Sequence, residues 1–222
     1  MGVSQKLDRL ARDISFTQSI NLLTISSNKD NHSKTNSILD RFCFEILPRI
    51  RHNIECFTLD SLSIDRVLSI GNYSKLHKLT LINFQYEEAS RLFIDKSSVI
   101  HNFKHQISHL TITFNDNTMV EHTEKLCTNI FITIFTLFTN LTHLHFNLND
   151  NCRFVPTSFI DLPFTIRNTT SIVYLNVSVH NFDDCLCLLD GRLSQLHTFI
   201  VQVNYIEDTS IIINNTVKYF KL

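Results

Sequence analysis

Glycine, proline and tryptophan are scarce in this 222-residue chain, which has three glycines, three prolines and no tryptophan. Gly2, Gly71 and Gly191 lie far apart, so the sequence offers no glycine-rich loop of the type that cradles a phosphate or a dinucleotide. The tight two-residue turns of a hairpin-rich β-sandwich also favour glycine. The shortage therefore argues against nucleotide-binding α/β folds and against a β-sandwich.

The chain also lacks an excess of charge of either sign, because 20 Lys and Arg nearly balance 21 Asp and Glu and give a formal net charge of −1. Without surplus basic side chains to contact phosphates, no nucleic-acid partner is expected. The most apolar stretch, residues 126–138, is shorter than the roughly 20 residues that span a bilayer, so no membrane association is expected. No apolar leader follows the charged N-terminus, which predicts the cytoplasm, or alternatively the nucleus, as the location.

Cysteine and histidine are the residue types that could bind a metal or act as nucleophile and base. The six cysteines form no C-x-x-C pair, so we expect reduced thiols that pack as small apolar groups. Among the eleven histidines, His143 and His145 share one face of a predicted strand and could chelate a metal with a third ligand, but exposed polar surface is the simpler interpretation. No G-x-S-x-G nucleophile elbow occurs, so the sequence predicts no catalytic residue. We also expect no metal site and no cofactor.

A short phrase recurs along the chain, consisting of an apolar residue, two others, an apolar residue, one other and a final apolar residue. Its copies begin at Ile20, Ile54, Leu76, Ile107, Leu141, Ile172 and Leu196, and a further copy begins at Val217. The interval between copies ranges from 21 residues, between Leu196 and Val217, to 34 residues, between Ile20 and Ile54. Because successive side chains of a strand point to opposite faces, each phrase predicts a short strand with one buried face.

Between these phrases, apolar residues recur at helical spacing. Three stripes predict helices, and they consist of Ile38, Phe42, Ile46 and Ile50; of Leu92, Phe93, Val99, Ile100 and Phe103; and of Phe182, Cys185, Leu186 and Leu189. Asp183 and Asp184 would begin the third helix and Gly191 would follow its end, as helix dipoles and C-terminal caps favour. Residues 126–138 suit a buried helix, although their alternating isoleucines would equally suit a strand.

Strands that alternate with helices predict an α/β fold with a parallel sheet. We expect about seven strand–loop–helix units stacked as an irregular, leucine-rich-repeat-like solenoid, with the helices on the outer, convex side of the sheet, because one unit alone cannot bury its apolar face. Residues 1–15 would be an N-terminal polar segment and residues 16–222 a single repeat domain. The alternative is an ordinary α/β layer with the same strands in another order.

The recurring phrase resembles the leucine-rich-repeat consensus, L-x-x-L-x-L-x-x-N/C-x-L. Its asparagine position is filled by Asn28, Asn115, Asn149 and Asn204. The segments 44–50 and 183–193 each precede a predicted strand. Because of these segments and the recurring phrase, the chain is similar to the repeat region of divergent F-box/leucine-rich-repeat proteins. In that family the repeats capture a protein target, and an F-box couples it through a Skp1-type adaptor to a ubiquitin ligase. No F-box is recognised in this chain, so such an adaptor is expected only if an F-box is supplied elsewhere.

The residues between the inward apolar positions of each strand are expected to face away from the helices. They are polar and nearly uncharged, and tyrosine is a frequent anchor at protein interfaces. The predicted partner-binding residues are Lys78, His109, Thr111, His143, His145, Tyr174, Asn176 and Thr198. The predicted function is protein recognition without enzymatic activity, as the target-binding part of a ubiquitin ligase adaptor if the resemblance holds. The alternatives are a structural or truncated repeat fragment without a ligand, and an unrecognised α/β hydrolase.

Overall fold

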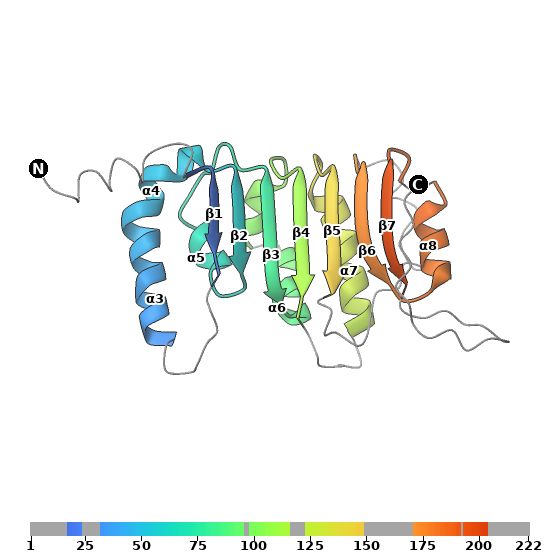
Figure 1. Ribbon diagram of the computed structural model, residues 1–222, viewed down its shortest axis with the longest axis horizontal. Coiled ribbons are helices and arrows are strands. Elements are labelled where there is room, and N and C mark those ends of the chain that lie inside the picture. The colour runs from blue at the N-terminus through green and yellow to red at the C-terminus, as the bar shows by residue number, and fades with distance from the viewer. Residues whose placement is uncertain are drawn as a thin grey trace, which may run out of the picture. The chain divides into compact units, whose positions relative to one another are not determined.

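The computed structural model describes residues 17–23, 32–95, 98–115, 123–148, 171–191 and 193–203. Seven strands lie side by side in chain order and form one parallel sheet (Figure 1). They are β1 (Ser19–Leu22), β2 (Cys56–Asp60), β3 (Lys78–Phe84), β4 (His109–Phe114), β5 (His143–Leu148), β6 (Tyr174–Val179) and β7 (Thr198–Val203). The predicted α/β class with a parallel sheet is therefore confirmed.

The chain divides into two compact units, Met1–Leu81 and Ile82–Leu222, which we describe one after the other. The predicted N-terminal segment 1–15 and the additional phrase at Val217 lie outside the described residues. The division into residues 1–15 and one repeat domain over residues 16–222 stays a prediction.

In the first unit, a run of helical segments lies between β1 and β2 and one helix lies between β2 and β3. They are α3 (His32–Arg41), the π-helical turn η2 (Phe42–Ile46), α4 (Leu47–Ile50), the 3-10 turn η3 (Arg51–Asn53) and α5 (Ile64–Leu68). Leu39, Cys43 and Leu47 are buried, whereas Ile38 is 70% exposed and Ile46 is 40% exposed. The predicted stripe is thus displaced by one residue as far as Leu47, because both sets recur every four residues and only packing within the unit selects one of them. Ile50 is buried as predicted, with 4% of its surface exposed.

Strand β1 pairs with β2 three residues away from the register that the recurring phrase predicts. Ile20 lies opposite Phe57, whereas the phrase places Leu23 at that position. Thr17 is 2% exposed and takes the place of the first apolar residue, while Leu23 is 39% exposed. The predicted position of the copy that begins at Ile20 is therefore wrong by three residues. Leu22 and Leu23 are adjacent and either can continue the alternation, so the sequence pattern does not fix the register of this strand.

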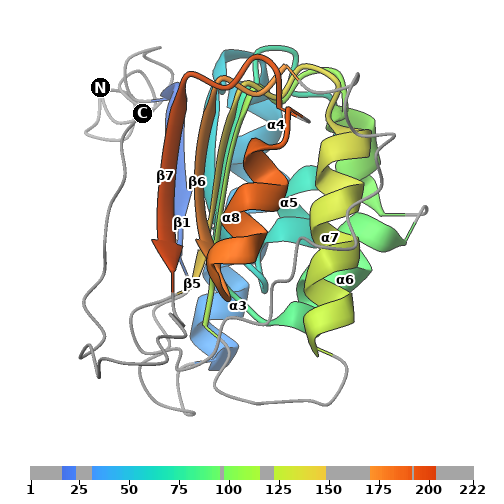
Figure 2. The same cartoon turned by 90° about the vertical axis from the view of Figure 1, so that its right-hand side faces the viewer.

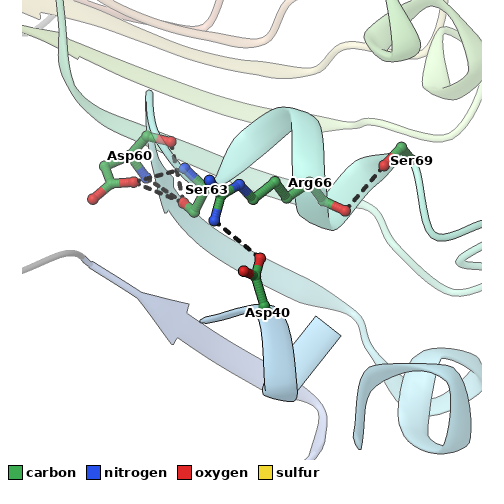
Figure 3. Close-up of polar contacts among 5 residues, drawn as sticks. All are labelled: Asp40, Asp60, Ser63, Arg66 and Ser69. Carbon is green, nitrogen blue, oxygen red and sulfur yellow. Dashed lines mark hydrogen bonds and ion pairs between the residues drawn. The ribbon is translucent and has the colours of Figure 1, made fainter. Parts of the chain in front are cut away.

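A buried polar turn connects β2 to α5 (Figure 3). The backbone N–H of Ser63 donates to Asp60 Oδ1 at 3.0 Å, and the Ser63 hydroxyl donates to the same oxygen at 2.8 Å. The backbone N–H of Asp60 donates to Ser63 Oγ at 3.1 Å. Strand alternation would place the Asp60 side chain outside the core, yet Asp60 is 6% exposed because its carboxylate holds this turn. On the exposed surface nearby, Arg66 pairs with Asp40 at 3.1 Å, a contact worth about 0–1 kcal/mol.

In the second unit, the described helices follow β3, β4 and β6 and lie on one side of the sheet. They are α6 (Tyr86–Ile94), the 3-10 turn η4 (Val99–Phe103), α7 (Thr123–Leu137) and α8 (Phe182–Leu189). Figure 2 shows α6, α7 and α8 on the same side of β5, β6 and β7. The buried aromatic rings bridge the two layers, since Phe131 on α7 meets Phe146 on β5 edge to face at 5.3 Å between ring centroids. This side of the strands is therefore the packed side.

The apolar stretch at residues 126–138 forms α7, so the predicted buried helix is confirmed. Its buried residues recur every three or four positions and are Cys127, Ile130, Phe131, Ile134, Phe135 and Phe138. A strand would have buried every second residue instead. None of the helices in the described part of the chain has the length and apolar character needed to cross a membrane.

Helix α8 begins as predicted but buries another face. The Asn181 side chain accepts from the backbone N–H of Asp184 at 3.0 Å, and Asp184 accepts in return from Asn181, which is a capping box. Gly191 follows the helix with φ +92. The predicted stripe is wrong at Phe182, Leu186 and Leu189, which are 55%, 54% and 44% exposed, whereas Cys185 and Leu188 are buried. Apolar residues lie on both faces, so periodicity could not choose between them.

From β4 to β7, the register follows the recurring phrase. Leu110, Leu144, Leu175 and Phe199 lie opposite one another on successive strands, and all are buried. Of the four predicted asparagine positions, only Asn115 lies in the described residues. Its side chain is exposed, and its backbone N–H donates to the carbonyl of Phe84 at 2.9 Å. The described contact of Asn115 therefore comes from its backbone.

Candidate functional site

We define the polar face as the face of β4–β7 opposite to α6, α7 and α8. Residues paired in register form two rows across it, which are His109, His143, Tyr174 and Thr198 in the first row and Thr111, His145, Asn176 and Ile200 in the second row. Each of these side chains is partly exposed, and the residues that alternate with them are buried. The structure therefore brings together all predicted partner-binding residues except Lys78, which is exposed at the start of β3 in the first unit.

Three flat rings of the first row stack on one another. The rings of His109 and His143 have centroids 4.2 Å apart and planes that differ by 10°, and those of His143 and Tyr174 have centroids 5.6 Å apart and planes that differ by 19°. Neighbouring parallel strands lie about 4.8 Å apart, so rings at paired positions meet face to face. The parallel register thus builds a continuous aromatic surface from residues more than thirty positions apart in the sequence.

The Thr142 side chain holds the ring of His143 in place. Its hydroxyl oxygen lies 3.0 Å from the carbonyl of Ser108 and 2.9 Å from His143 Nδ1, so the hydroxyl is within hydrogen-bond distance of both. The same carbonyl also accepts the backbone N–H groups of Thr142 and His143. Thr142 therefore links the backbone at Ser108 to the ring of His143.

The neighbouring imidazole in the second row, His145, is held by an amide group. Asn176 Nδ2, which can only donate, lies 3.2 Å from His145 Nδ1, so Nδ1 accepts and Nε2 carries the proton. Burial lowers the pKa of His145 below its ordinary value of 6.5, because desolvation disfavours the charged form. His145 is therefore a neutral hydrogen-bond donor at neutral pH.

Sequence reasoning missed the hydroxyl groups that orient the first row. Ser108 Oγ lies 2.9 Å from His109 Nδ1, and the Thr142–His143 pair repeats this arrangement one strand further on. A signal was present, since a hydroxyl residue directly precedes a histidine at the same point of two consecutive phrases. Ile200 was also absent from the predicted set, although it completes the second row. Ser178, which alternation places on the polar face, is instead 3% exposed.

The polar face offers hydrogen bonds and flat apolar surface without fixed charge. None of its described positions on β4–β7 carries Asp, Glu, Lys or Arg. Across the described ranges, no group of three or more His, Cys, Asp or Glu side chains is placed to hold a metal ion. Such a surface suits the binding of a neutral, hydrogen-bonding partner.

The described cysteines are free thiols, of which Cys43, Cys127 and Cys185 are buried. Burial raises the pKa of Cys43 and of Cys56, and burial together with the charge of Asp184 raises the pKa of Cys185 to about 11. A raised pKa reduces the thiolate that attacks electrophiles and binds soft metals. Cys43, Cys56 and Cys185 are therefore weak nucleophiles. Cys152 lies outside the described residues.

No protein-family model matches this chain, and no match was found among curated proteins or among solved structures.

Proposed function

We propose that this chain is a protein-recognition module whose partner binds the polar face. The observation that carries the proposal is the stack of His109, His143 and Tyr174, a preformed and partly exposed aromatic surface flanked by a row of hydrogen-bonding side chains. Because the rings are already ordered, a partner that covers them loses little side-chain entropy on binding. Tyr174 is the strongest candidate for an anchor, since tyrosine dominates many interfaces.

We further propose that the units form a leucine-rich-repeat-like solenoid, with its helices on the convex side. The parallel strands in chain order and the regular register from β4 to β7 support this proposal. A solenoid stabilises each unit through its neighbours, so its stability should fall in steps when terminal units are removed. Urea unfolding of chains truncated unit by unit would test this expectation.

The resemblance to F-box/leucine-rich-repeat proteins leads to the narrower proposal that the module selects targets for ubiquitin ligation. It requires an F-box supplied elsewhere, through which a Skp1-type adaptor would bind. An F-box encoded upstream of this sequence in its transcript would support the proposal. Co-precipitation of the adaptor with the longer product, and not with this chain alone, is the expected result.

The recognition proposal is tested by affinity capture from cell extract followed by substitution. Tyr174→Ala and His145→Ala should each remove a defined set of captured proteins. Matched controls lie away from the polar face: Phe182→Ala removes an exposed aromatic ring on α8, and His105→Ala removes an exposed imidazole. An empty captured set, as expected for a structural fragment, or a set that both polar-face variants leave unchanged, would contradict the proposal.

A hydrolase is the second candidate function, because Ser108 Oγ lies at hydrogen-bond distance from His109. A serine nucleophile needs such a base. However, the Thr142–His143 pair has the same geometry, so the arrangement belongs to the repeating framework of the strands. Hydrolysis of p-nitrophenyl acetate that Ser108→Ala abolishes, with folding retained, would favour the hydrolase.

A further inference from the structure

One row of large apolar side chains on α8 is exposed. Phe182, Leu186 and Leu189 are 55%, 54% and 44% exposed. They follow one another at intervals of four and three residues, so they form one continuous row along the helix, which we call the α8 stripe. Single exposed apolar side chains are common, whereas a contiguous exposed patch is typical of a surface that binds another molecule. Because α8 lies on the helix side of the sheet, the α8 stripe is separate from the polar face (Figure 2).

Helix geometry shows which way the α8 stripe points. The buried residues of α8 are Asp184, Cys185 and Leu188. At about 100° per residue, the stripe lies about 120° around the helix from these buried residues. Since α8 is right-handed and runs antiparallel to the strands, as a crossover between parallel β6 and β7 requires, this rotation turns the stripe towards the side of the sheet beyond β7. Figures 1 and 2 show α8 at this end of the second unit.

The surface around the α8 stripe is acidic. Residues 181–192 contain three aspartates and one arginine, which gives the segment a formal net charge of −2. One of the aspartates, Asp183, is exposed in the first turn of α8. The helical rotation places it beside the stripe, on the side away from the buried residues. The α8 stripe is therefore an apolar row flanked by negative charge, whereas the polar face has no fixed charge at its described positions.

We propose that the α8 stripe binds an amphipathic helix of another protein, with apolar residues on one face and basic residues beside them. The apolar face of that helix removes Phe182, Leu186 and Leu189 from water, and a basic residue lies near Asp183. Amphipathic helices are recognised through side chains three and four positions apart, which is the spacing of the stripe. Apolar contact supplies the affinity, and charge selects the partner. This site is additional to the polar face and does not depend on the recognition function proposed there.

Other occupants fit the α8 stripe less well. A second copy of this chain would bring the same net charge of −2 against itself, and like charges oppose such a contact. An anionic membrane surface would be repelled for the same reason. An added β-strand needs backbone N–H and C=O groups to pair with, whereas the side of a helix presents side chains. A basic amphipathic helix meets none of these obstacles and gains from both the apolar row and the charge.

Two synthetic peptides test the proposal on the full-length chain. Both are designed as helices with leucines on one face, and they differ only in the flanking residues, which are lysine in one peptide and glutamate in the other. Fluorescence anisotropy at low ionic strength measures their binding. The lysine peptide should bind about tenfold more tightly than the glutamate peptide, and added salt should reduce the difference. Equal binding of the two peptides, or no binding of the lysine peptide, would overturn the proposal.

Substitutions in the chain test the position of the site. Leu186→Ser interrupts the stripe at its centre and should weaken binding of the lysine peptide about tenfold, as the loss of one buried leucine contact does. Asp183→Asn should reduce the preference for the lysine peptide over the glutamate peptide. The matched control is Leu62→Ser, because Leu62 is a 56% exposed leucine in the first unit, and this variant should bind as the wild-type chain does. Equal losses in Leu186→Ser and Leu62→Ser would show that the peptide does not bind the stripe.

The remaining outcomes identify other occupants and would contradict the proposal. A dimer in sedimentation equilibrium that Leu186→Ser dissociates would show that a second copy covers the stripe. A clear fall in the urea midpoint on Leu186→Ser, without binding of the lysine peptide, would show that another part of the same chain covers it. Neither outcome bears on the polar face, since proteins lost on Tyr174→Ala should still be captured by Leu186→Ser.

Discussion

The imidazole rings of His109 and His143 occupy paired positions on β4 and β5 and stack with their centroids 4.2 Å apart. The two residues are 34 positions apart in the chain, so only the parallel register brings the rings together. Hydroxyl groups at Ser108 and Thr142 lie beside their Nδ1 atoms. The pair is therefore an ordered part of the sheet surface and not two independent side chains.

This stacking predicts energetic coupling between the two histidines. In a double-mutant cycle with His109→Ala and His143→Ala, the coupling in the free energy of unfolding should be about 0.5–1 kcal/mol at pH 8, in the range of stacked ring pairs. Urea unfolding measures it. The control cycle pairs His109→Ala with Thr198→Ala, whose residues lie on β4 and β7, and should be additive within about 0.5 kcal/mol. Equal coupling in both cycles would contradict the stack.

Gly71 should resist substitution because its backbone has φ +146, a conformation that residues with a side chain rarely adopt. Gly71→Ala should lower the free energy of unfolding by about 1–3 kcal/mol. A new Cβ would also meet Arg51 Nη1, which donates to the carbonyl of Ile70. Arg51→Ala removes that clash but not the backbone strain, so the double variant should remain destabilised. Full recovery of stability in the double variant would show that the clash alone is responsible.

His145 should make stability depend on pH. Burial lowers its pKa in the folded chain, so the unfolded chain, with an ordinary value of 6.5, binds the proton more readily. The contribution of His145 is therefore fully present above pH 6.5 and is lost as the pH falls below that value through the folded pKa. Between pH 7.5 and pH 5, the free energy of unfolding should fall more in the wild-type chain than in His145→Asn. Phe182→Ala, which changes no titrating group, should keep the wild-type slope, and parallel curves for His145→Asn would contradict the prediction.

Cys185 should react slowly with alkylating reagents. With a pKa of about 11 instead of the ordinary 9.0, the thiolate fraction at pH 8 is lower on the order of 100-fold. Site-resolved mass spectrometry after timed exposure to iodoacetamide measures the rate. Cys187, which is partly exposed on the same helix, is the internal comparison. In the native chain Cys185 should be the slower of the two, and in urea the two rates should converge. Equal native rates would be inconsistent with the burial of Cys185.

Periodicity is more informative on the strands of this protein than on its helices. Residues Leu110, Leu144 and Leu175 were predicted to be buried and paired, and they are, because alternation on a strand allows only two faces and only one of them is apolar. On α8, by contrast, Phe182 and Cys185 are both apolar, and the structure buries only Cys185. A helix with apolar residues on both faces leaves the choice to its neighbours.

The sequence predicted which residues belong to the candidate site but not how their side chains are arranged. Strand alternation alone was sufficient to place His143 and Tyr174 on the same face of the sheet. Their stacking and the contacts of His143 with Thr142 and of His145 with Asn176 were not predictable. These features depend on contacts between residues about thirty positions apart, and local spacing contains no information about them.

By itself, the sequence determined the class of fold and the strands, because apolar residues at the phrase positions must leave water and a parallel crossover requires the long intervals between them. Tertiary structure alone decided which face of α3 and of α8 is buried, the three-residue displacement of β1 and the hydrogen bonds that orient the two imidazoles of β5. The reason is physical: solvent exclusion acts on each residue separately, whereas register and hydrogen-bond direction exist only between segments that have already come together.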